Sequence, residues 1–201
     1  MPATASEPQS VLPAGLTMRL EALTPQHETR LIGLIETSGL RYPPYDPGNA
    51  RSSASYGWKY DYQGDRFQPC PPLPEGFAEV AAIAAAFAGK QTGDLAECLL
   101  NRYEPGALIQ SHIDKPVWDL VIGISLGSAS TMVFSRPAPD SAGREVIPVR
   151  LEPRSMFILS GDSRHAFEHA LEPMQDMRWS ITFRTFSQEG LARLRENAAE
   201  I

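Results

Sequence analysis

The sequence predicts a mostly β domain with flanking helices, an α+β fold in which short strands form a sandwich or jelly roll. Three observations support this prediction. Short apolar or alternating runs follow one another from residue 98 onward, separated by turn residues such as Pro105-Gly106 and Gly161. Many strands at this spacing are typical of two packed sheets. Two helical patterns precede these runs, and 201 residues are enough for one sizeable core.

The first half of the chain predicts a short strand and two helices. Residues 17–23 read as the strand, and Thr24 and Pro25 suit the N-cap and first turn of a helix that ends before Gly39. The other segments are a loop over 41–51, an aromatic strand or hairpin arm over 55–62, a proline-rich extended connector over 68–76 and an Ala-rich helix over 77–88.

The second half predicts strands and one closing helix. The strands span residues 98–103, 120–126, 131–134, 146–151, 156–159 and 179–186, and a polar helix covers 188–200. No apolar run is long enough to span a bilayer, so we expect no membrane segment. The chain is expected to be a monomer.

Charge and cysteine content narrow the possible partners and the compartment. The net charge of −6 argues against tight, non-specific nucleic-acid binding, although a local basic patch remains compatible with it. Cys70 and Cys98 form no CxxC pair, and the first twelve residues lack the features of a secretory signal. Two reduced thiols in a cytoplasmic protein are therefore expected.

Two histidines and one carboxylate form a candidate metal site. His112 and Asp114 are two residues apart, so on an extended segment they point to the same face. With His169 they make up the ligand set of non-haem iron(II) oxygenases, which leaves coordination positions open for other ligands. The alternative is that His112 is a surface residue and His169 a hydrogen-bonded core histidine.

A strand with strict alternation provides a second candidate site. Arg178, Ser180, Thr182 and Arg184 share one face, opposite an apolar face. Two arginines on one face are costly to bury without an anion, and their planar forks suit carboxylates. Upstream, Asn101 and Tyr103 share a face of another predicted strand. The alternative for all six residues is an ordinary solvated strand face.

Five segments of the second half keep the order and spacing of one known family. They are Asn101–Ala107, the His112-x-Asp114 pair, Gly123–Gly127, Gly161–Arg164 leading to His169, and Arg178-x5-Arg184. Together these motifs resemble the AlkB family of Fe(II)- and 2-oxoglutarate-dependent dioxygenases. The resemblance covers roughly residues 97–186. Where relatives often have Tyr and Gly, this chain has His165 and Ala170.

The resemblance implies a fold and a domain layout. Residues 1–16 would be a disordered leader, and residues 17–201 a single domain. Residues 97–186 would form a catalytic double-stranded β-helix, or jelly roll. Residues 17–96 would supply helices packed on one sheet and a substrate lid.

The resemblance also implies a ligand set. Iron(II) would be held by His112, Asp114 and His169, with O2 and 2-oxoglutarate as the other reactants. The residues expected to hold 2-oxoglutarate are Asn101, Tyr103, Arg178 and Arg184, assisted by Ser180 and Thr182. Arg178 and Tyr103 would meet the distal carboxylate, and Arg184 and Asn101 would lie nearer C1. Arg164 is expected to hold a loop.

The activity implied is oxidative demethylation of N-alkylated bases in DNA or RNA, as in DNA repair. Tyr56, Trp58 and Tyr60 would stack on a flipped base, with Lys59, Arg51 and Arg66 nearby. Alternatively, these aromatic residues only pack the N-terminal layer. The second candidate substrate is a protein side chain or a small metabolite, which the negative net charge of the chain favours. A non-catalytic binding module is disfavoured by the intact triad and both arginines.

Overall fold

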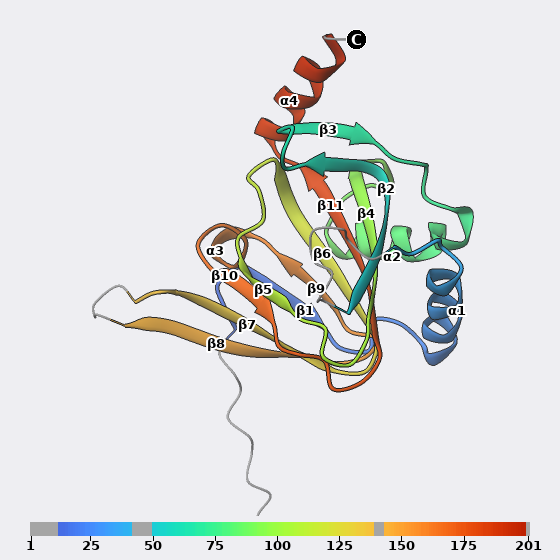
Figure 1. Ribbon diagram of the computed structural model, residues 1–201, viewed down its shortest axis with the longest axis vertical. Helices are drawn as coiled ribbons and strands as arrows, with labels where there is room; N and C mark the ends of the chain where they lie inside the picture. The colour runs from blue at the N-terminus through green and yellow to red at the C-terminus, as the bar shows by residue number, and fades with distance from the viewer. Residues whose placement is uncertain (1–11, 42–49, 139–142, 200–201) are drawn as a thin grey trace, which may run out of the picture.

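Two antiparallel sheets face each other in the computed structural model, which describes residues 12–41, 50–138 and 143–199 (Figure 1). The larger sheet has the order β1-β9-β6-β11-β4-β2-β3, and the smaller has the order β5-β10-β7-β8. This is the jelly-roll arrangement expected from the sequence. Most of the expected leader and of the loop over 41–51 lies outside the described residues.

The elements follow one another with short connections. The strands of the larger sheet are β1 (Leu16–Arg19), β2 (Arg51–Asp61), β3 (Arg66–Pro69), β4 (Leu95–Tyr103), β6 (Trp118–Gly127), β9 (Met156–Leu159) and β11 (Arg178–Phe186). Those of the smaller sheet are β5 (Ile109–His112), β7 (Ser130–Pro137), β8 (Arg144–Leu151) and β10 (Glu168–Leu171). The helices are α1 (Pro25–Glu36), η1 (Glu75–Phe77), α2 (Ala78–Phe87), η2 (Thr92–Asp94), α3 (Gly161–His165) and α4 (Gln188–Ala199).

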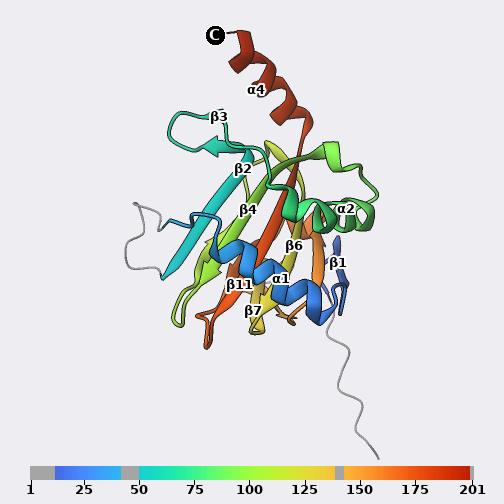
Figure 2. The same ribbon diagram turned by 90° about the vertical axis from the view of Figure 1, so that its right-hand side faces the viewer.

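Helices α1 and α2 lie against the outer face of the larger sheet (Figure 2). The α1 helix begins where the sequence indicates, because the Thr24 hydroxyl accepts a hydrogen bond from the His27 backbone N–H and Pro25 opens the first turn. Its apolar stripe buries Leu31 and Ile35 completely. Among the described residues, no helix is long and apolar enough to cross a membrane.

Two apolar layers hold these elements together. One layer lies between the helices and the larger sheet and includes Ile181 and Phe183 of β11. The other lies between the two sheets and includes Phe134 of β7 and Phe157 of β9. Because Ile181 and Phe183 face the helices, the alternate residues of β11 face the smaller sheet. Both sides of the larger sheet are therefore covered, and polar groups on its inner face are enclosed.

Gly57 divides β2 into two parts with different partners. Residues 51–57 pair with β4, and residues 58–61 pair with β3. Gly57 has φ +78°, and a Cβ at this position would lie 2.5 Å from the Ala96 carbonyl oxygen. A residue with a side chain would be strained here. The glycine therefore lets the strand change partners while it stays close to β4.

The structure contains short elements that the sequence pattern does not predict. The strands β5 and β10 have four residues each, which is too short for a clear alternation pattern. They form because each pairs with a neighbour of the smaller sheet. The ordered chain also begins before residue 17, since Leu16 already pairs with Leu159 in β1.

Candidate metal centre

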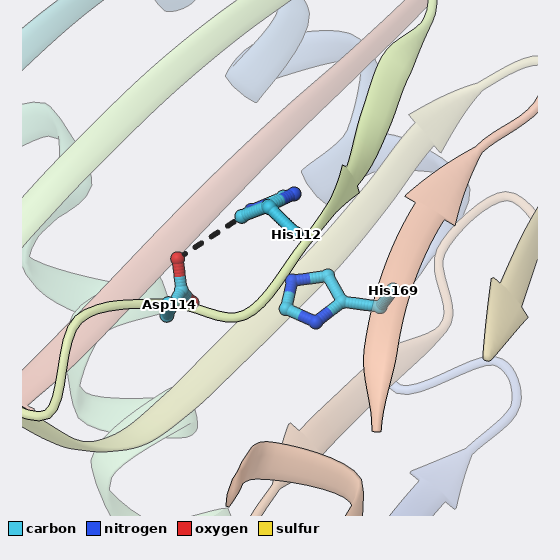
Figure 3. A group of neighbouring side chains, drawn as sticks. All are labelled: His112, Asp114 and His169. Atoms are coloured by element: carbon cyan, nitrogen blue, oxygen red, sulfur yellow. Dashed lines mark ion pairs between the residues drawn. The ribbon is translucent and has the colours of Figure 1, made fainter. Parts of the chain in front are cut away.

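Pairing of β5 with β10 brings two histidines together. His112 lies directly opposite His169 in this antiparallel pair, and such cross-strand neighbours have Cβ atoms about 4.5–5.5 Å apart. Their ring centroids are 4.4 Å apart. Asp114 follows β5 and turns its carboxylate toward the same space (Figure 3). The predicted convergence is confirmed, because one ligand atom from each of the three residues lies within 4.8 Å of the others.

His112 is oriented as a metal ligand, and His169 has the protonation state of one. His112 Nδ1 lies 2.9 Å from the Gln110 carbonyl oxygen, so as a donor it leaves the Nε2 lone pair facing Asp114, 3.6 Å from Oδ1. Burial lowers the pKa of His169 to about 4. His169 is therefore neutral near pH 7, which is the form of imidazole that binds metals.

Arg164 fixes the loop that carries Asp114. Its guanidinium is completely buried and donates hydrogen bonds to the carbonyl oxygens of Asp114 at 3.0 Å, Lys115 at 2.6 Å and Trp118 at 2.8 Å. These bonds satisfy backbone carbonyls of the segment between β5 and β6 and of the first residue of β6. The expectation that Arg164 holds a loop is confirmed.

Asp114 is ionised in this environment. Burial alone would raise the pKa of Asp114, but the charge of Arg184 and the hydrogen bond with His112 outweigh it, so the net pKa lies well below its usual range. Arg184 Nη2 is 3.4 Å from Asp114 Oδ1, and its Nη1 donates to Glu97 Oε2 at 2.5 Å. An ionised carboxylate beside two histidines is a complete set of protein ligands for iron(II).

The second cluster lies on the face of the larger sheet that is turned toward the smaller sheet. In the β11–β4 register Arg178 is opposite Tyr103 and Ser180 is opposite Asn101. The Asn101 amide donates to Ser180 Oγ at 3.3 Å, and the Tyr103 hydroxyl lies 3.4 Å from that oxygen. Arg178 Nε donates to Ser125 Oγ at 3.2 Å. Thr182 lies between Ser180 and Arg184 on this face.

Several buried polar atoms of this cluster have no partner within the described part of the chain. They are Arg178 Nη1, Asn101 Oδ1 and Arg184 Nε. Burial also lowers the pKa of Arg178, which its interaction with Tyr103 opposes. An unpaired buried guanidinium is unfavourable, and a carboxylate would satisfy it. The donor set therefore fits a dicarboxylate next to the triad.

Two of the three aromatic residues expected to stack on a base, Tyr56 and Tyr60, occupy packing positions instead. Tyr56 is buried against the helices, and its hydroxyl donates to the Ser38 carbonyl oxygen at 3.2 Å. Tyr60 is buried against Phe67 and donates to Asp65 at 2.5 Å. Trp58 is half-buried and packs against the same apolar cluster as Tyr60. The buried rings of Tyr56 and Tyr60 present no open face to a base.

Other residues near the site were not singled out from the sequence. Glu97 continues the series 97, 99, 101, 103 on one face of β4, so the alternation could have revealed it. Tyr62 and Lys115 come from different segments, and the Lys115 ammonium lies 6.0 Å from the centre of the Tyr62 ring. Only the fold brings these two together.

The fold and this site together define the class of the protein. The sequence profile of the 2OG-Fe(II) oxygenase superfamily matches residues 26–191. The chain belongs to this superfamily, and within it to the AlkB-like dioxygenases. It is accordingly an oxidoreductase that uses iron(II), 2-oxoglutarate and O2.

Individual relatives agree with this assignment. The chain is 27% identical over 187 residues to alpha-ketoglutarate-dependent dioxygenase AlkB of Escherichia coli, which covers 88% of this chain and 76% of that protein. It is 29% identical over 171 residues to Xenopus tropicalis alkbh8, named a tRNA (carboxymethyluridine(34)-5-O)-methyltransferase, covering 81% of this chain. The match spans only 26% of that frog protein's length.

Solved structures show the same fold. The structure of OsALKBH1 superposes with a TM-score of 0.67 at 19% identity and covers 89% of this chain and 100% of that one. A prolyl hydroxylase from Trichoplax adhaerens superposes with a TM-score of 0.60 at 14% identity, covering 89% and 86% of the two chains.

Proposed function

We propose that His112, Asp114 and His169 hold the iron, and that Arg178, with its neighbours, holds 2-oxoglutarate. The neighbours in question are Asn101, Tyr103, Ser180, Thr182 and Arg184. One observation carries the proposal: three converging ligand atoms lie next to a buried guanidinium that has no anionic partner among the described residues. When bound, iron(II) and 2-oxoglutarate supply the activation of O2 that oxidises a substrate carbon.

The protein's own groups would prepare the site for this chemistry. The neutral imidazole of His169 and the ionised carboxylate of Asp114 are ready to bind a cation without first losing a proton. His112 is oriented by its contact with the Gln110 carbonyl. The polar face of β11 would orient the cosubstrate, and the apolar layer between the sheets would exclude water.

The substrate we propose is an N-alkylated base in DNA or RNA, which the enzyme would demethylate. Two relatives' names support a nucleic-acid substrate: the frog alkbh8 named above, and a Danio rerio protein named probable RNA/DNA demethylase ALKBH6, 25% identical over 138 residues. A role in DNA repair, a cytoplasmic location and a monomeric state stay predictions.

The surface near the site also supports a nucleic-acid substrate. Lys59 and Lys115 are exposed and form no ion pair with any described residue. Most surface arginines, in contrast, are neutralised by carboxylates; these are Arg30, Arg102, Arg136, Arg144, Arg150, Arg154 and Arg193. Tyr62 is 58% exposed, so we propose it, in place of Tyr56 and Tyr60, as the base-stacking residue.

A titration of methylated single-stranded DNA at two salt concentrations tests this proposal. Binding should weaken with salt, and Lys59→Gln or Lys115→Gln should each reduce the salt slope by about 1. Tyr62→Ala should weaken binding by about 1–3 kcal/mol, the contribution of one stacked base. Arg19→Gln, on the edge strand β1 at the opposite end of the larger sheet from β3, serves as the control.

A protein side chain or small metabolite is the second candidate substrate, favoured by the net charge of −6. If the wild-type protein binds no oligonucleotide at low salt, the nucleic-acid proposal fails. Succinate release with a panel of methylated peptides and metabolites would then identify the substrate class.

A further inference from the structure

Arg184 lies between two buried carboxylates. On β11 it is directly opposite Glu97 of β4. Its Nη1 donates to Glu97 Oε2 at 2.5 Å, and its Nη2 lies 3.4 Å from Asp114 Oδ1. The side chains of Arg184, Glu97 and Asp114 are only 13%, 6% and 4% exposed. Glu97 thus reaches the metal centre through one intervening residue.

The two contacts engage both terminal nitrogens of Arg184 but only two of its five N–H donors. Its Nε is without a partner in the described chain. Arg184 thus already interacts with two carboxylates of the protein itself. Arg178, which has an unpartnered Nη1 and no carboxylate neighbour among the described residues, is better suited to hold the carboxylate of a cosubstrate.

The cluster places two carboxylates on one guanidinium. Arg184 and Asp114 alone would form a neutral pair, and Glu97 adds a second carboxyl group. The pKa of Glu97 is raised, because burial outweighs the opposing charges of Arg184 and Lys59. A cation bound beside Asp114 would favour the ionised form of both carboxyl groups. Residues that orient a ligand in this way commonly tune metal affinity.

We propose that Glu97 is a positioning residue for the metal site. By binding Nη1, it keeps Nη2 of Arg184 directed at Asp114 and neutralises the guanidinium, so that the Asp114 carboxylate remains an effective metal ligand. The inference rests on the proposed function, because it takes His112, Asp114 and His169 as the metal ligands.

The direct test compares metal and cosubstrate affinity in Glu97→Gln. Co(II) affinity, followed by its absorption spectrum, should fall about 10- to 100-fold. Affinity for 2-oxoglutarate at saturating Mn(II) should stay at the wild-type level. The matched control is Glu145→Gln, which removes one of the two carboxylate partners of Arg136 in a partly exposed ion pair and should change neither affinity.

A second variant tests whether Glu97 acts through Arg184. In an Arg184→Gln background, Glu97→Gln should cause no further loss of Co(II) affinity, because the connecting guanidinium is gone. A full additional loss would overturn the inference. If Glu97→Gln does not fold, Glu97→Asp is measured in its place, because it keeps the carboxylate but moves it away from Nη1 of Arg184. Reduced Co(II) affinity in Glu97→Asp supports the inference, and wild-type affinity overturns it.

The outcomes separate this inference from the proposed function. A wild-type protein whose Co(II) binding is absent, or is unaffected by His169→Ala, refutes the metal site itself. If wild type binds Co(II) through the triad and Glu97→Gln binds it equally well, only the role of Glu97 is refuted. Loss of 2-oxoglutarate affinity with unchanged Co(II) affinity would assign Glu97 to the cosubstrate and also refute the inference.

Discussion

Replacing Arg178 with Met should weaken 2-oxoglutarate binding without unfolding the protein. Arg178 is 2% exposed, donates to Ser125 Oγ at 3.2 Å, and lies 4.9 Å from the centre of the Tyr103 ring. Methionine retains most of the buried volume but removes the charge and the donors. The lost contact is a charge-assisted hydrogen bond in a buried site, about 1.5–3 kcal/mol, or about 10- to 140-fold in affinity.

The same substitution should leave the apo protein at least as stable as wild type, because it removes a buried charge that lacks an anion. The assay is titration of 2-oxoglutarate at saturating Mn(II), with thermal unfolding of the apo protein measured in parallel. Arg150→Met is the control, since Arg150 is exposed and pairs only with Glu152. Wild-type 2-oxoglutarate affinity in Arg178→Met would refute the assignment of the carboxylate clamp.

Two further predictions concern proton release and backbone strain. Co(II) binding at about pH 5.5 should release one proton. Burial lowers the pKa of His169 to about 4, so this histidine is already neutral. The hydrogen bond with Asp114 raises the pKa of His112, so that histidine is protonated and must lose its proton to bind the metal. Calorimetry in two buffers of different ionisation enthalpy counts the protons, and release of two would contradict these assignments. Gly57→Ala should destabilise the fold by about 1–3 kcal/mol, because φ is +78° and the new Cβ would lie 2.5 Å from the Ala96 carbonyl oxygen; an unchanged urea midpoint would count against the strain.

The polar face of β11 could be predicted because the period of a strand is two. Alternation alone places Arg178, Ser180, Thr182 and Arg184 together, whichever neighbours the strand acquires. The pair His112 and Asp114 follows from the same rule. The polar face of β11 and the pair of His112 and Asp114 together predict the site without knowledge of the fold.

Alternation could not show which face of β2 is turned toward the site. It correctly groups Tyr56 and Tyr60 on one face, but that face packs on the helices and on an apolar cluster. The pairing of β5 with β10 was also beyond reach, because each strand depends on a partner distant in the sequence. The contact of His112 with His169 is therefore a product of topology and not of local sequence.

The two arginines of β11 show how the same residue type serves opposite needs. Burial lowers the pKa of Arg178, and no carboxylate of the described residues compensates it. Burial would also lower the pKa of Arg184, but the charges of Asp114 and Glu97 reverse the direction. One end of the strand face thus lacks an anion among the described residues, and the other already holds two carboxyl groups. A dicarboxylate would place its free carboxylate at the first end, and its metal-binding oxygens would lie toward a cation held by His112, Asp114 and His169. The charge imbalance along β11 therefore accounts for the direction in which 2-oxoglutarate would enter the site.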